Sequence, residues 1–165
     1  IFSLQENKGD NMKALISKKY LDYFDMKVLS KEVCNLFDDY NFMYSLVKEH
    51  MFERTNFTST SKSKINTSNE ELKSILKNES YINYLKEFEK KIENLKTTFT
   101  DDELVVFHYS IEDRETDKEI CERIKKTYKT YFIIKKSCYI KVALKFNLLS
   151  DTIEETLERT FATVV

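Results

Sequence analysis

Apolar residues recur every three or four positions along much of this chain, which is the spacing of one face of an α-helix. Within residues 12–52, two such series follow each other: Leu15, Tyr20, Tyr23 and Phe24, then Val33, Leu36, Phe37, Tyr40, Tyr44, Val47 and Met51. The pattern predicts an N-terminal helical region over residues 1–53. Its aromatic-rich face is expected to be buried in a core or an oligomer interface.

A polar stretch interrupts this periodicity. Residues 54–69, RTNFTSTSKSKINTSN, contain few large apolar side chains, so they predict a linker or long loop. A long connecting helix is expected next, over residues 70–99, with a bend or break near residues 78–80. Its start is indicated by the capping box Ser68-x-x-Glu71, in which each side chain satisfies a free backbone N–H near the other residue.

The connecting helix carries a heptad seam with 4-3-4-3-4 spacing. Its members are Tyr81, Leu85, Phe88, Ile92, Leu95 and Phe99. Such a seam must be buried against another surface. We favour a role in the core of the same chain, and a homodimer through residues 81–99 stays open as an alternative.

Two more capping boxes predict helix starts in residues 100–150. Thr100 is followed three positions later by Glu103, and Thr116 is followed in the same way by Glu119. Acidic residues crowd both first turns, which suits the positive end of a helix dipole. Capping explains the run of acids after Thr100 better than catalysis or metal binding, because three consecutive helical residues point in different directions.

A long helix is then expected from residue 128 to about residue 146. Its core-facing stripe would consist of Tyr131, Ile134, Cys138, Val142 and Phe146. Two short capped elements followed by this basic helix predict a helix-turn-helix over residues 100–150. Residues 117–124 would lie across a DNA backbone, and the long helix would enter the major groove by its N-terminal end. Residues 151–165 are expected to form a tail or a short helix.

Charge supports this interpretation. The chain has 27 Lys or Arg against 28 Asp or Glu, yet residues 123–150 contain eight Lys or Arg and no acid. A segregated basic surface favours an anionic partner, here double-stranded DNA. The expected contact residues are Lys125, Lys126, Thr127, Tyr128, Lys129, Thr130, Phe132, Lys135 and Lys136, with Lys129, Thr130 and Lys136 ranked first.

Composition narrows the fold class and the chemistry. A single Gly and no Pro argue against hairpin-rich sheets, so we predict an all-α fold. Three cysteines without C-x-x-C spacing are expected to be reduced, and two isolated histidines predict no metal site. We expect no cofactor. Because phosphate-loop, zinc-protease and nucleophile-elbow motifs are missing, we expect no enzyme activity.

The sequence also bears on where in the cell the protein is located. No apolar run approaches the ~20 residues of a membrane span, and no signal peptide is visible, so we expect no membrane partner and a cytoplasmic location. Ile1 is not an initiator residue. Therefore either residues 1–11 are an added segment or the chain is a fragment.

Residues 100–148 resemble a known family. The pattern T-D-x-E-x-x-V…D-K-E-I-C-E-R-I…K-T-Y-F-x-x-K-K-x-C…A-L-K-F-N-L is similar to the region-four helix-turn-helix of sigma factors. It resembles the ArpU/RinA group of phage late-gene regulators more closely, through Thr130-Tyr131-Phe132, the small residue Cys138 and the ending at residues 141–148. The resemblance covers about a third of the chain and implies a transcriptional regulator of phage or mobile-element genes in a bacterial host.

The chain departs from that family at two points. Lys125-Lys126-Thr127 replaces a turn that usually carries Gly or Ile-Ser, so a lysine must take any left-handed conformation there. Ile133 stands where the family usually has a basic residue, so a base contact is not transferred to that position.

Two other functions remain open. A small alternative sigma factor would need an upstream domain that binds core RNA polymerase, and residues 12–95 show no recognisable match to one. A helical protein–protein interaction module would instead use the basic helix on an acidic partner. For the transcriptional regulator, contact with RNA polymerase is an open question as well.

Overall fold

The computed structural model describes residues 13–57 and 69–148, and all regular elements in these ranges are helical, as predicted. In chain order they are α1 Lys18–Leu21, α2 Met26–Phe57, α3 Asn69–Lys96, α4 Asp101–Val106, the π-helix η1 Phe107–Glu112, α5 Asp117–Ile124 and α6 Tyr128–Lys145. None of these helices is long and apolar enough to cross a membrane.

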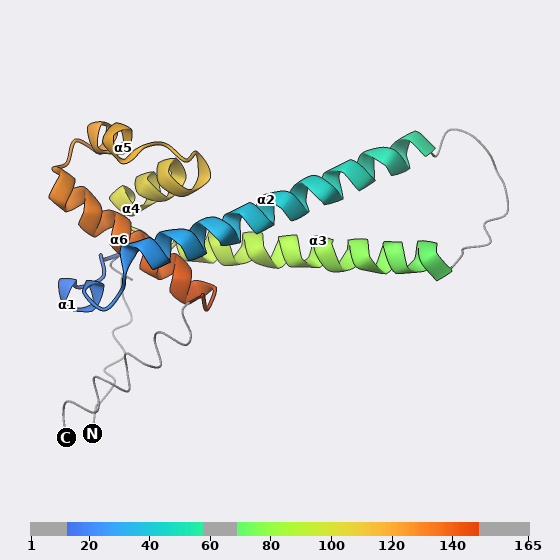
Figure 1. Ribbon diagram of the computed structural model, residues 1–165, viewed down its shortest axis with the longest axis horizontal. Helices are drawn as coiled ribbons and strands as arrows, with labels where there is room; N and C mark the ends of the chain where they lie inside the picture. Colours follow the sequence, from blue (N-terminus) through green and yellow to red (C-terminus); the bar gives the residue numbers. More distant parts are fainter. Residues whose placement is uncertain (1–12, 58–68, 149–165) are drawn as a thin grey trace, which may run out of the picture.

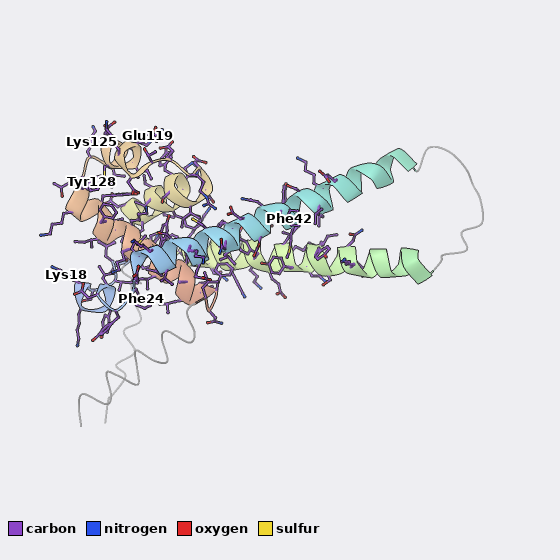
Figure 2. The ribbon with its side chains drawn as sticks, viewed as in Figure 1. Lys18, Phe24, Phe42, Glu119, Lys125 and Tyr128 are labelled. Atoms are coloured by element: carbon purple, nitrogen blue, oxygen red, sulfur yellow. The ribbon has the colours of Figure 1, made fainter. Side chains whose placement is uncertain are left out.

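The molecule consists of a small helical bundle and a long hairpin that projects from it (Figure 1). The hairpin is formed by α2 and α3, which run in opposite directions. The bundle contains α1, α4, η1, α5 and α6 together with the near ends of α2 and α3. Farther along the hairpin, Phe42 of α2 is 65% exposed, and Figure 2 shows it well away from the bundle.

The heptad seam, which begins on α3 and ends at Phe99 just beyond that helix, lies in the core of the same chain. Five of its six members are buried: Leu85, Phe88, Ile92, Leu95 and Phe99. Phe88 packs edge-to-face on Phe37 and stacks on Tyr40, both from α2, with ring centroids 5.4 and 4.3 Å away. This burial confirms the favoured core role. These five side chains are covered within the same chain by α2 and α6, and a homodimer through residues 81–99 stays an untested prediction.

Several predicted boundaries were wrong. The chain is not helical throughout residues 12–52, because α1 ends at Leu21 and α2 begins only at Met26. Asp25 starts α2, since its carboxylate accepts a hydrogen bond from the Lys27 N–H at 2.7 Å. The linker was expected from residue 54, but α2 continues to Phe57.

The expected bend near residues 78–80 is also absent, and α3 is continuous from Asn69 to Lys96. Asn, Glu and Ser each cost only a few tenths of a kcal/mol in a helix, and no Gly or Pro is present to break it. The capping box at Ser68, residues 1–11 and the tail at 151–165 lie outside the described residues.

Local sequence correctly predicted the helix starts in the bundle. Thr100 and Glu103 form the reciprocal capping box of α4, and Thr116 and Glu119 form that of α5. The expected stripe of α6 is also confirmed, since Tyr131, Ile134, Cys138 and Val142 are buried and Phe146 is half-buried.

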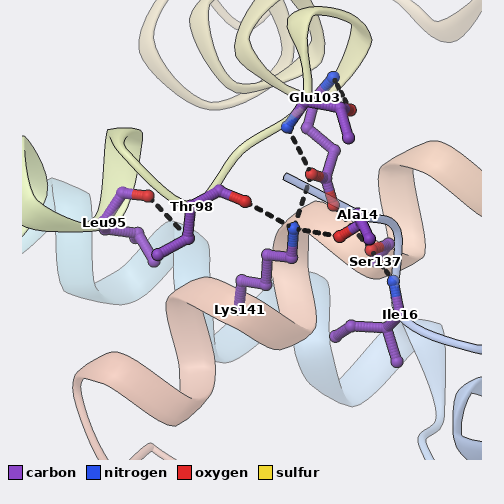
Figure 3. A network of polar contacts seen from close by, with 8 residues as sticks. Ala14, Ile16, Leu95, Thr98, Glu103, Ser137 and Lys141 are labelled. Atoms are coloured by element: carbon purple, nitrogen blue, oxygen red, sulfur yellow. Dashed lines mark hydrogen bonds and ion pairs between the residues drawn. The ribbon is translucent and has the colours of Figure 1, made fainter. Parts of the chain in front are cut away.

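A buried ion pair joins the parts of the bundle (Figure 3). The Lys141 ammonium on α6 donates to a carboxylate oxygen of Glu103 at 2.7 Å and to the carbonyls of Ala14 and Thr98 at 2.8 and 2.9 Å. The Ser137 hydroxyl donates to the other Glu103 oxygen at 2.6 Å and accepts from the Ile16 N–H at 2.8 Å. Four chain segments therefore meet at one carboxylate and one ammonium group.

We predict that Lys141→Met destabilises the fold by about 3 kcal/mol or more, because the fully buried Glu103 carboxylate would lose its counter-ion. Urea unfolding followed by circular dichroism measures this change. Lys145→Met is the matched control, since Lys145 is exposed one turn farther along the same helix, and its effect should stay within about 0.5 kcal/mol. Equal midpoints for the two variants would contradict the prediction.

Candidate nucleic-acid interface

The two helices expected in the helix-turn-helix begin at the predicted residues and are separated by the predicted turn. α5 spans eight residues, the turn comprises Lys125 to Thr127, and α6 starts at Tyr128. α4 and η1 pack behind both helices, and Ile120 of α5 is completely buried. These helices form a unit of three parts: α4 continued by η1, then α5, then α6. The N-terminal end of α6 lies next to α5 at one end of the molecule (Figure 1).

The turn is built without glycine. Lys125 follows α5 in the left-handed conformation, with φ 52° and ψ 39°. The chain then returns to extended geometry at Thr127, whose hydroxyl accepts a hydrogen bond from the Thr130 N–H and caps α6. Lys125 therefore adopts a left-handed conformation, which a glycine would adopt with less strain.

Asp117 holds α5 against α6. One of its carboxylate oxygens accepts hydrogen bonds from the Tyr131 hydroxyl and the Lys135 ammonium, each at 2.6 Å. Partial burial tends to raise the pKa of Asp117, but these two hydrogen bonds outweigh burial and lower that pKa below its ordinary value. Burial and the same carboxylate raise the pKa of Tyr131, which therefore stays a neutral donor.

The basic segment is partly neutralised within the fold. Lys126 lies 3.6 Å from Asp102, Lys135 lies 2.6 Å from Asp117, and Lys141 lies 2.7 Å from Glu103. Arg123 pairs with Glu115 through two hydrogen bonds of 2.9 Å. Half of the eight cations in residues 123–150 are thus balanced by acids on or just before α4 and α5.

The other cations are Lys125, Lys129, Lys136 and Lys145, which make no ion pair with the described residues. Lys129 and Lys136 are seven positions apart and so share one face of α6. Lys125 lies in the turn just before that helix. These three form the cationic part of the predicted interface, whereas Lys145 lies at the opposite end of α6.

The predicted site residues fall into two groups. Lys125, Lys126, Thr127, Tyr128, Lys129 and Thr130 are exposed around the start of α6, whereas Phe132, Lys135 and Lys136 are partly buried. Lys135 differs most from expectation, since its side chain is only 13% exposed and its charge is used on Asp117. Phe132 packs against Tyr128 with ring centroids 4.8 Å apart.

Sequence reasoning missed two groups near this surface. Asp117 was expected only as one of the first-turn acids that suit the helix dipole, although it also links α5 to α6. The other group is Lys18 and Lys19 on α1, which packs against α6. Both lysines are exposed, and Figure 2 shows Lys18 at the same end of the molecule as Tyr128 and Lys125.

A pocket of about 260 Å³ between α2, α3 and η1 is a different kind of feature. Phe37, Phe88 and Ile92 supply apolar lining, and Glu89, Glu93 and Glu112 are also among its lining residues. Burial and the hydrogen bond to Glu89 raise the pKa of Tyr40 in this lining to about 12. The carboxylates would repel phosphate, so this pocket is a poor candidate for nucleic acid.

Comparison of the chain with protein-family models, curated proteins and solved structures finds no match.

We predict that Lys125→Gly stabilises the protein by about 0.5–1 kcal/mol, because glycine takes the left-handed conformation without a Cβ penalty. The free energy of unfolding in urea measures the change. The same substitution at Lys90, within α3, should destabilise by about 1 kcal/mol. A loss of stability in both variants would show that Lys125 is not strained.

We also predict that Asp117 makes the fold sensitive to acid. Its folded pKa is below the unfolded value of about 4, so its contribution is fully present above pH 4 and is lost as pH falls through the folded pKa. Asp117→Asn should lower stability at pH 7 by about 1 kcal/mol and flatten the decline below about pH 4. Unfolding curves across that range test this, with the exposed Asp39→Asn as control. An unchanged pH profile would rule out the role of Asp117.

Proposed function

We propose that this protein is a sequence-specific DNA-binding transcriptional regulator that inserts the N-terminal half of α6 into the major groove. The observation that carries the proposal is the exposed start of α6, where Lys125 and Lys129 make no ion pair with the described residues. This start follows α5 after a three-residue turn, as a helix-turn-helix requires. α5 would lie across the phosphate backbone, as in other proteins that use this motif.

Charge placement supports the proposal. Lys125, Lys129 and Lys136 are the cations of this surface that have no internal counter-ion among the described residues. Three acids of α4 and α5, Asp102, Glu103 and Asp117, pair with lysines of the basic segment. What remains exposed at the start of α6 is suited to phosphate oxygens.

The resemblance of residues 100–148 to the ArpU/RinA group extends the proposal to activation of late genes in a phage or mobile element. The α2–α3 hairpin would then be available for RNA polymerase. Its exposed aromatic side chains Phe42 and Tyr44 suit a protein contact better than a nucleic-acid backbone.

The decisive experiment is binding to a mixed-sequence duplex, followed by fluorescence anisotropy over a salt series. We predict a log–log slope of about −3, because three lysines would neutralise about three phosphates. Lys129→Glu/Lys136→Glu should abolish binding at moderate salt, since it reverses two of these charges.

The matched control is Lys86→Glu/Lys90→Glu, which makes the same charge change on exposed positions of α3. It should keep most of the affinity and the same slope. Equal loss in both double variants would indicate attraction by net charge alone. A flat, weak response of the wild-type protein would exclude DNA binding and favour the protein–protein interaction module.

A further inference from the structure

One stripe of residues on α6, exposed at the start of the helix and partly buried farther along, has an unusual chemical content for a helix that reads DNA. Its members are spaced so that they share one face. They are Tyr128, Lys129, Phe132, Ile133 and Lys136. Farther along the helix, Tyr139, Ile140 and Ala143 continue the same face, but all three are buried. Only the first nine residues of α6 are therefore open to a partner on this side.

Apart from Lys129 and Lys136, this stripe lacks side chains that make bidentate contacts to bases. Between Thr127 and Lys136 the chain has no Arg, Asn or Gln, which can form paired hydrogen bonds with guanine or adenine, and no Asp or Glu, which can accept a hydrogen bond from cytosine. The Thr130 hydroxyl already lies 2.9 Å from the Thr127 hydroxyl, so it is partly occupied within the cap.

The centre of the stripe is apolar instead. Phe132 and Ile133 are half-buried against the core, so each presents one side outward from a fixed position. The ring of Tyr128 packs edge-to-face on Phe132, which extends the apolar surface toward the helix start. Lys129 and Lys136 flank this surface. An apolar patch between two cations complements a groove whose floor carries methyl groups and whose walls carry phosphates.

Thymine is the base that offers an apolar group in the major groove, through its C5-methyl. We propose that α6 recognises its DNA site mainly through thymine methyl groups, which contact Phe132 and Ile133 while Lys125, Lys129 and Lys136 bind phosphates. This inference rests on the proposed function, because it needs α6 to enter the major groove.

The test starts with selection of bound duplexes from a random 20-base-pair library. The strongest selected duplex is then synthesised with thymine and with uracil, which lacks the methyl group but keeps the same hydrogen bonds. We expect the selected sites to be rich in A·T pairs and uracil to weaken binding about tenfold, as for two lost methyl contacts. Fluorescence anisotropy measures both affinities.

Two variants assign the effect to residues. Ile133→Ser should bind the thymine duplex more weakly and should lose a large part of the preference over uracil. Lys129→Gln should weaken both duplexes by the same factor and keep the preference, because its contact is to phosphate. Phe132 is left unchanged, since its contact with the core would confuse a folding defect with a binding defect.

The outcomes separate the two proposals. Tight, salt-dependent binding with equal affinity for thymine and uracil would overturn thymine recognition and leave the proposed function intact. Selection of G·C-rich sites, or a preference for thymine that Ile133→Ser leaves unchanged, would overturn it as well. If no duplex is retained at any salt concentration, the proposed function itself fails.

Discussion

The ion pair between Glu103 and Lys141 determines how the bundle is put together. Glu103 is completely buried, and its two carboxylate oxygens receive hydrogen bonds from Lys141, Ser137 and the N–H of Thr100. A buried carboxylate is tolerated only when its hydrogen bonds are complete. The cost of leaving it incomplete therefore fixes α4, α6 and the segment before α1 in one arrangement.

The same principle explains much of the charge asymmetry in the sequence. Acids gather in the first turns of α4 and α5, and bases gather in the turn before α6 and along α6. These two groups meet in the folded chain, where Lys126, Lys135 and Lys141 each find an acid. Ion pairs inside the fold therefore explain part of the excess of basic residues in this segment. The proposed DNA surface therefore has fewer available cations than the sequence suggests, namely Lys125, Lys129 and Lys136, which make no ion pair with the described residues.

Local signals predicted what depends on near neighbours in the sequence. The capping boxes at Thr100 and Thr116 involve residues three positions apart, and the heptad seam is a local periodicity that runs along α3 and just past its end. The use of Lys141 could not be predicted this way, because its partner Glu103 is 38 positions away and already had a local explanation as a capping residue. Lys135 is a similar case, since Asp117 is 18 positions away. The sequence alone does not distinguish a lysine that faces solvent from a lysine that pairs with a distant acid.

A helix that reads DNA must be held firmly from behind, because base recognition depends on side chains placed within a fraction of an ångström. In α6 the support comes from two sides. Tyr131 and Lys135 attach its first half to Asp117 of α5, and Ser137 and Lys141 attach its second half to Glu103 of α4. Each anchor uses an ionised carboxylate, so the helix is positioned by directional contacts as well as by apolar packing. Since apolar contacts with a base lack the directionality of hydrogen bonds, a reading surface centred on Phe132 and Ile133 would take its geometric precision from these anchors.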